Sequence, residues 1–131
     1  MADVLETEVG RRTTALAVVT TTEIVCATTA PLAPPRPGVR AVLRGLVELD
    51  SGTGTDGVTI RIRRGTTISG ALVSEAIEEE TTALLAETWV VSAVDTLGDV
   101  ATVQYVVTIQ QASASANGSV DNATIEVDLI G

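Results

Sequence analysis

Short stretches in which apolar and polar residues alternate constrain this chain more than any other feature of its sequence. Residues 58–63 run Val-Thr-Ile-Arg-Ile-Arg, and residues 124–129 run Thr-Ile-Glu-Val-Asp-Leu. Successive side chains of a β-strand point to opposite faces, so each of these stretches presents one apolar and one polar face. The pattern predicts strands that each cover one side of an apolar core.

The residues available for that core are almost all aliphatic. Hydrophobic residues make up 45% of the 131-residue chain, but Trp89 and Tyr105 are the only aromatic residues and Phe is absent. The β-branched residues and the many threonines favour strands over helices. A chain of this length buries roughly two-thirds of its unfolded surface, which is enough for one domain. Because Cys26 is the only cysteine, no intrachain disulfide is possible.

Turn-forming residues divide the chain into about eight predicted strands, at the spacing of a two-layer antiparallel β-sandwich. We expect an N-terminal arm or terminal strand within residues 1–14 and a single sandwich domain over 15–131. The strands are expected at residues 3–9, 15–27, 39–50, 58–63, 70–76, 82–94, 100–111 and 119–129. A helix over 72–85 is the weaker alternative, because Gly70 and the pair Thr81-Thr82 disfavour it.

Two segments predict how the strands connect. Residues 39–50 and 58–63 alternate on either side of a glycine-rich stretch, so they are expected to pair as a hairpin. Gly45 falls on the inward face of the first of these strands, where it marks either a bulge or close packing. All four prolines fall within residues 31–37. Proline donates no backbone hydrogen bond, so this stretch is expected to be a loop that crosses the domain.

The composition excludes most enzyme chemistry. The chain contains neither His nor Lys, which removes the commonest general base, the commonest zinc ligand and the Schiff-base nucleophile. A Ser-His-Asp or Cys-His arrangement cannot be built. The stretch 50–56 faintly resembles a glycine-and-aspartate calcium loop, but it lacks the regular ligand spacing and is interpreted as a plain turn. We expect no catalytic residue, no metal ion, no cofactor and no enzymatic activity.

The charge of the chain limits its partners. The net charge is −9, and every basic residue lies between Arg11 and Arg64. A nucleic acid or an anionic membrane surface is therefore not an expected partner. No run of about 18 apolar residues predicts a membrane span, and no signal peptide is recognisable.

Several strands carry apolar residues on both faces, which predicts a subunit interface. Val42 and Leu46 lie on the otherwise charged side of residues 39–50, and in 88–94 the pair Trp89 and Val91 alternates with further valines. Apolar surface gathered on successive strands is typical of an interface. We expect a closed homotrimer, with a dimer as the alternative.

Outward arginines on two strands predict a basic patch on this acidic protein, formed by Arg40, Arg44, Arg61, Arg63 and Arg64. Two interpretations stay open: cross-strand pairing with Glu48 or Asp50, or docking to an acidic surface. The candidate protein-contact residues are Arg11, Arg12, Arg40, Val42, Arg44, Leu46, Arg61, Arg63, Trp89 and Val91.

Three segments resemble small β-sandwich virion proteins of tailed bacteriophages, which decorate capsids or sit on tails. They are residues 36–40 (RPGVR), 54–66 (GTDGVTIRIRRGT) and 105–111 (YVVTIQQ). The resemblance implies a jelly-roll-like fold, often trimeric, that binds and reinforces assembled shell proteins. It implies a capsid decoration (cement) protein located in the virion, with the phage major capsid protein or another virion protein as partner. The alternative is a minor tail, fibre or glycan-binding module. The arm at 1–14 and the outward arginines are the candidates for shell contact.

Overall fold

The computed structural model describes residues 3–12, 16–19, 21–50, 57–78, 86–111 and 118–131, some of them at segment ends by backbone alone. All regular secondary structure in this part is β-strand. The strands are β1 (Val4–Arg12), β2 (Leu16–Val19), β3 (Ile24–Thr28), β4 (Arg40–Asp50), β5 (Val58–Arg64), β6 (Ala71–Glu78), β7 (Ala86–Thr96), β8 (Tyr105–Gln111) and β9 (Gly118–Ile130).

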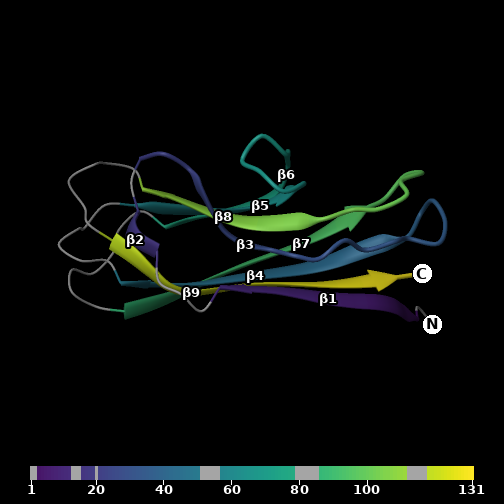
Figure 1. Cartoon of the computed structure of the whole chain (residues 1–131), viewed down its shortest axis with the longest axis horizontal. Helices are drawn as coiled ribbons and strands as arrows, with labels where there is room; N and C mark the ends of the chain where they lie inside the picture. The colour runs from purple at the N-terminus through teal and green to yellow at the C-terminus, as the bar shows by residue number, and fades with distance from the viewer. Residues whose placement is uncertain (1–2, 13–15, 20, 51–56, 79–85, 112–117) are drawn as a thin grey trace.

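These strands form two antiparallel sheets that face each other (Figure 1). The larger, five-stranded sheet has the order β1-β9-β4-β7, with β2 also pairing along β9, and the four-stranded sheet has the order β3-β8-β5-β6. If β1 and β2 are taken as one interrupted strand, the first strand pairs with the last, the second with the second to last, and so on inward to β5 with β6. A long hairpin that is then rolled up has this pairing, which is the topology of a jelly roll. The predicted all-β, antiparallel, jelly-roll-like sandwich of about eight strands is confirmed.

The two ends of the described chain lie side by side, as this topology requires (Figure 1). Asp3 and Gly131 exchange two backbone hydrogen bonds, of 3.2 and 3.1 Å. Residues 4–12 run along β9 over their whole length, so they are part of the larger sheet.

The predicted hairpin between residues 39–50 and 58–63 is wrong. β4 lies in the larger sheet between β9 and β7, whereas β5 lies in the smaller sheet between β8 and β6. Alternation correctly gave the buried face of each strand, but it does not identify the neighbouring strand. The connection is also longer than the two-residue turns that force consecutive strands to pair. Residues 51–56 of this connection lie outside the described residues.

The proline-rich stretch connects the two sheets, as expected of a crossing loop. It follows β3 of the smaller sheet and precedes β4 of the larger one. Leu32 anchors it, because this side chain is fully buried and its backbone exchanges two hydrogen bonds of 2.9 Å with Val103. The loop therefore closes one end of the core.

Alternate residues of the central strands fill the space between the sheets. Val58, Ile60 and Ile62 of β5 are buried as predicted, and Tyr105 is fully buried at the start of β8. Gly45 marks close packing: a Cβ at this position would lie 3.0 Å from side-chain atoms of Val91 and Val107. The pairing of β4 has no register shift at this point, so no bulge is present there.

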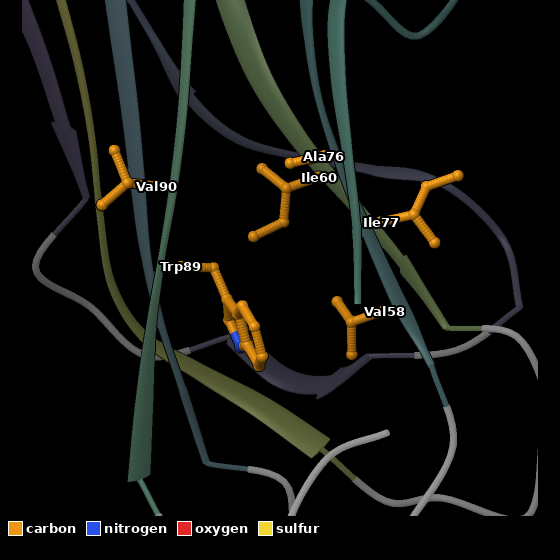
Figure 2. A pocket seen from close by; sticks show the side chains of 6 residues that line it. All are labelled: Val58, Ile60, Ala76, Ile77, Trp89 and Val90. Carbon is orange, nitrogen blue, oxygen red and sulfur yellow. The ribbon is translucent and has the colours of Figure 1, made fainter. Parts of the chain in front are cut away.

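The two long sides of the sandwich are closed differently. On the β1 and β3 side the backbones touch, because a Cβ built on Gly10 would overlap the carbonyl oxygen of Thr28. On the β6 and β7 side, Ser74 Oγ donates a hydrogen bond of 3.0 Å to the carbonyl oxygen of Ser92. Next to this contact a cavity of about 140 Å³ remains (Figure 2). It is lined by Val58, Ile60, Ala76, Ile77, Trp89 and Val90.

Candidate protein interface

The outer face of the larger sheet presents its side chains in columns, one column for each strand. Alternation sends the even-numbered residues of β4 outward, and the strand register sets their neighbours. Arg44 lies between Ser92 of β7 and Glu126 of β9, and Val42 lies in the next row. We call this surface the mixed face. Its outward residues are Val4, Thr7, Val9 and Arg11 on β1, Asn122, Thr124, Glu126, Asp128 and Ile130 on β9, Arg40, Val42, Arg44, Leu46 and Glu48 on β4, and Thr88, Val90, Ser92, Val94 and Thr96 on β7.

Aliphatic side chains stand exposed along both margins of the mixed face. Val90 and Val94 are 52% and 61% exposed on the β7 margin, and Val4 and Val9 are 62% and 44% exposed on the β1 margin. Single exposed aliphatic residues are normal on protein surfaces, but rows of them on edge strands mark a contact surface. Each margin of the mixed face therefore leaves aliphatic surface exposed to solvent.

Charged side chains separate the two margins. Glu126 and Asp128 are the outward carboxylates of β9, and Arg40 and Arg44 alternate with Val42 and Leu46 on β4. Thr7 donates a hydrogen bond of 2.6 Å to Asp128 Oδ1. Among the described residues no ion pair joins either arginine to a carboxylate. Glu48, one of the two predicted partners, instead accepts a hydrogen bond of 2.7 Å from Asn122.

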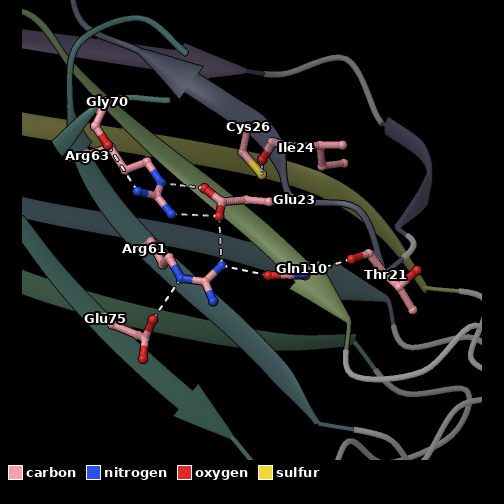
Figure 3. Close-up of polar contacts among 9 residues, drawn as sticks. All are labelled: Thr21, Glu23, Ile24, Cys26, Arg61, Arg63, Gly70, Glu75 and Gln110. Carbon is pink, nitrogen blue, oxygen red and sulfur yellow. Dashed lines mark hydrogen bonds and ion pairs between the residues drawn. The ribbon is translucent and has the colours of Figure 1, made fainter. Parts of the chain in front are cut away.

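The arginines of β5 are placed differently, in a polar network on the outer face of the smaller sheet (Figure 3). Arg63 Nε lies 2.6 Å from Glu23 Oε2, and Arg61 Nη1 lies 2.8 Å from Glu23 Oε1. Arg61 Nε also lies 2.7 Å from Glu75 Oε2. Two cations and two carboxylates balance here, so Arg61 and Arg63 form intramolecular ion pairs, with partners other than the predicted ones.

This network also explains a strand that is buried on both faces. Thr108 and Val106 of β8 point outward yet are fully buried, and their cross-strand partners in β5 are Arg61 and Arg63. The Arg63 guanidinium beside Glu23 holds the pKa of that carboxyl below its usual value of 4.5. The network is a polar cover for the smaller sheet, which makes its arginines less available for docking.

Arg64 points inward and connects the sheets, which corrects the expected outward orientation. Its Nη2 lies 2.6 Å from Asp95 Oδ1 of β7, and Tyr105 donates its hydroxyl to Asp95 Oδ2 at 2.8 Å. Burial raises the pKa of Tyr105 above its usual value, and the neighbouring Asp95 carboxylate raises it further. This group therefore stabilises the fold.

The predicted contact residues thus fall into three places. Arg11, Arg40, Val42, Arg44 and Leu46 belong to the outer face of the larger sheet or its β1 margin. Arg61 and Arg63 belong to the polar network. The last three are Arg12, which ends β1, Trp89, which packs against the core, and Val91, which is 4% exposed within it.

Sequence reasoning missed the valines that do stand exposed. In β7 both alternating sets are apolar, so the pattern alone does not say which set faces the core. Val90 and Val94 face outward and Trp89 faces inward. Val4 and Val9 fall in the strand expected at residues 3–9, but neither was among the predicted contact residues. Val9 alternates with Glu6 and Glu8, whereas Val4 reaches the same face through the register shift between Val4 and Glu6.

The remaining features of the described residues offer little chemistry. The cavity of Figure 2 is lined by aliphatic side chains and the indole of Trp89, and its volume of about 140 Å³ is smaller than the roughly 300 Å³ of the smallest ligand pockets. No group of three or more metal-ligating side chains lies together in the described ranges, and the predicted turn at 50–56 falls largely outside them. A search of the same residues for helices that could cross a membrane finds none.

No protein-family model matches the chain, and no curated protein matches it either. Solved structures share its fold at low sequence identity. The Eiger TNF structure from S. frugiperda has a TM-score of 0.53 and 9% identity, over 98% of this chain and 94% of that one. The globular domain of the zebrafish complement 1qA protein has a TM-score of 0.51 and 10% identity, over 92% and 94% of the chains. A chain of the infectious bursal disease virus Gx strain structure has a TM-score of 0.55 and 8% identity, over 98% of this chain and 33% of that one.

At these identities the likeness shows the fold alone. The class that this fold defines is the jelly-roll β-sandwich, which this chain shares with a virus structure and with the TNF and complement domains. Together with the mixed face, this is consistent with a structural or binding module.

Proposed function

We propose that this protein is a structural module that binds other protein surfaces through non-covalent contacts, and specifically a capsid decoration protein of a tailed bacteriophage. The observation that carries the proposal is the mixed face, where exposed valines flank arginines and carboxylates on one sheet. Such a surface supplies apolar contact area and charge complementarity but contains no activated nucleophile or base. Its function would be binding, with no chemical step.

Two further observations support the virion assignment. The same fold occurs in the infectious bursal disease virus structure. Two of the segments that resemble phage virion proteins coincide largely with β5 and β8, the paired centre of the smaller sheet. The proposed partner is the phage major capsid protein or another virion protein. Many copies on one shell would add weak contacts by multivalency.

The positions of the aromatic residues do not support the alternative, a glycan-binding or receptor-binding tail module. Such modules stack ligands on exposed aromatic rings beside polar groups. Tyr105 is fully buried, and Trp89 packs on the core beside an apolar cavity. We therefore favour protein binding.

Co-sedimentation with empty shells of the phage or prophage that encodes the chain tests the function. The wild-type chain should pellet with the shells, and a V90D/V94D variant should lose most of this binding because it places charge on the β7 margin. Leu72→Asp is the matched control, since Leu72 is 52% exposed on β6, in the other sheet. A wild-type chain that stays in the supernatant at saturating shell concentration overturns the proposal.

A further inference from the structure

We propose that the cavity between β6 and β7 is a binding site for one small apolar molecule, about the size of a benzene ring. The inference goes beyond the proposed function and does not depend on it, because the cavity lies between the sheets whereas the mixed face is the outer surface of the larger one. The lining of the cavity, its position in the fold and its volume each favour this class of ligand.

The inner wall of the cavity consists of core-facing side chains from both sheets. Val58 and Ile60 of β5 are buried, Ala76 of β6 is the cross-strand partner of Ile60, and Trp89 comes from β7 of the other sheet. Figure 2 shows Val58, Ile60 and Trp89 turned towards one another around the cavity. A molecule held here would therefore contact both sheets.

The outer wall of the cavity is the seam between two edge strands. β6 ends the smaller sheet and β7 ends the larger one, so no hydrogen-bonded ladder joins them. Ile77 and Val90 line the cavity, but their side chains turn away from it (Figure 2) and stand exposed. A small molecule can therefore enter between these strands without breaking a ladder of either sheet.

The lining is too apolar to hold a water molecule firmly. Among the side chains that line the cavity, Trp89 Nε1 is the only polar atom, and it is buried without a hydrogen-bond partner in the described part of the chain. A water molecule in a protein cavity needs about two to four polar partners. An apolar ligand would therefore compete with no strongly bound water, whereas a polar ligand would lose hydrogen bonds on entry.

The volume limits the ligand to a compact one. The cavity of about 140 Å³ is too small for an ordinary ligand pocket. It is close to the volume of an engineered cavity of about 150 Å³ in another protein, which is lined by aliphatic and aromatic side chains and binds benzene or xenon. The expected ligand is therefore a single uncharged ring or a short branched hydrocarbon.

Trp89 is the only tryptophan of the chain, so its fluorescence reports on the site directly. The full chain is titrated with benzene up to the solubility of benzene in water. We expect a saturable change in Trp89 emission. We also expect the melting temperature to rise with benzene concentration, because a ligand that binds the folded state alone stabilises that state. A wild-type chain that shows no saturable change overturns the inference.

Ala76→Leu tests the location of the site, because the longer side chain occupies the cavity from β6. This variant should bind benzene at least about tenfold more weakly than the wild type, a loss of about 1.4 kcal/mol. Ala71→Leu is the matched control: it adds the same atoms to the same strand at an exposed position, and it should bind as the wild type does. Equal binding by Ala76→Leu and the wild type overturns the inference.

Xenon provides a test that needs no substitution and therefore does not depend on how a variant folds. In the wild-type chain, xenon should shift the methyl resonances of Val58 and Ile60, which line the cavity. It should leave those of Val127 and Leu129 unchanged, because these residues are buried in β9, away from the cavity. Equal shifts in both pairs, or none in either, contradict a site between β6 and β7.

Discussion

At the scale of single residues, polar side chains of this protein have two structural roles. Some join the two sheets to each other, and others cover the outer face of the smaller sheet. Asp95 joins β7 to Arg64 and to Tyr105 in the smaller sheet, and Glu23 joins two arginines of β5. Hydrogen bonds to charged groups are among the stronger ones in proteins, about 1.5–3 kcal/mol each. The ionisation of Glu23 and of Tyr105 should therefore report on folding.

Tyr105, the only tyrosine, is a direct probe of this coupling. Burial raises its pKa in the folded chain above the usual value of 10.0. The stability that this group contributes is thus present below pH 10 and is lost as the pH rises towards the folded-state pKa. We expect phenolate absorbance to appear together with the loss of the far-ultraviolet β signal in an alkaline titration. In urea the phenolate should form near its usual pKa. Phenolate that forms near pH 10 while the β signal is intact would contradict the assignment.

Glu23 provides a second residue-scale prediction, at acid pH. The hydrogen bond from Arg63 holds the pKa of Glu23 below 4.5. Burial of the carboxyl opposes this shift, and the charge of Arg61 adds to it. Its contribution to stability is therefore present above about pH 4.5 and is lost as the pH falls through the lower folded-state pKa. Glu23→Gln should lower the free energy of unfolding at pH 7 by about 2 kcal/mol, measured by urea denaturation.

The control for Glu23→Gln is Glu75→Gln. The Glu75 side chain also pairs with Arg61 but is 33% exposed, so its loss should cost less than about 1 kcal/mol. The difference in stability between wild type and Glu23→Gln should shrink on acidification below pH 4.5. Equal effects of the two substitutions, or a constant difference down to low pH, would argue against the network.

At the scale of elements, the close contact between β1 and β3 sets one side of the sandwich. Gly10→Ala places a methyl group against the Thr28 backbone, which cannot rotate away as a side chain could. Overpacking of this kind costs about 3 kcal/mol. Gly98→Ala is the matched control, because nothing lies within 4 Å of the added carbon, and its effect should stay within about 0.5 kcal/mol. Thermal melting of both variants measures the difference. If the Gly10→Ala variant has the same melting temperature as the wild type, β1 and β3 do not approach as closely as the structure shows.

The element scale also shows what the sequence could and could not reveal. Alternation located most strands and predicted the buried faces of β4, β5 and β9, because a strand with one buried face shows apolar and polar residues in turn along its sequence. It did not pair the strands: β4 and β5 follow each other in the chain yet lie in different sheets. Pairing in a jelly roll joins segments far apart in sequence, so no local pattern predicts it.

The candidate site was predictable in part for the same reason. Val42 and Arg44 were found because an apolar residue on a charged face breaks the alternation. Val90 and Val94 were not separated from Trp89, since β7 is apolar on both faces. The Glu23 contacts to Arg61 and Arg63 span 38 and 40 residues of sequence, and nothing near either arginine indicates that partner.

At the scale of the whole molecule, two electrostatic effects oppose each other within the folded chain. The net charge of −9 repels over long distances and destabilises the compact state. The ion pairs of Glu23 and Asp95 attract over a few ångströms. The Debye length falls from about 30 Å at 0.01 M salt to about 8 Å at 0.15 M, so salt screens the long-range repulsion more strongly than the short contacts. The balance should therefore shift towards the folded state as salt is added.

We expect the melting temperature to rise by a few degrees between about 0.01 M and 0.15 M sodium chloride, the range over which long-range screening changes most. The R44E/E126R double variant is the control, because it keeps the net charge of −9, and its salt response should match that of the wild type. A melting temperature that instead falls steadily from the lowest salt would mean that the local ion pairs dominate the stability of the fold.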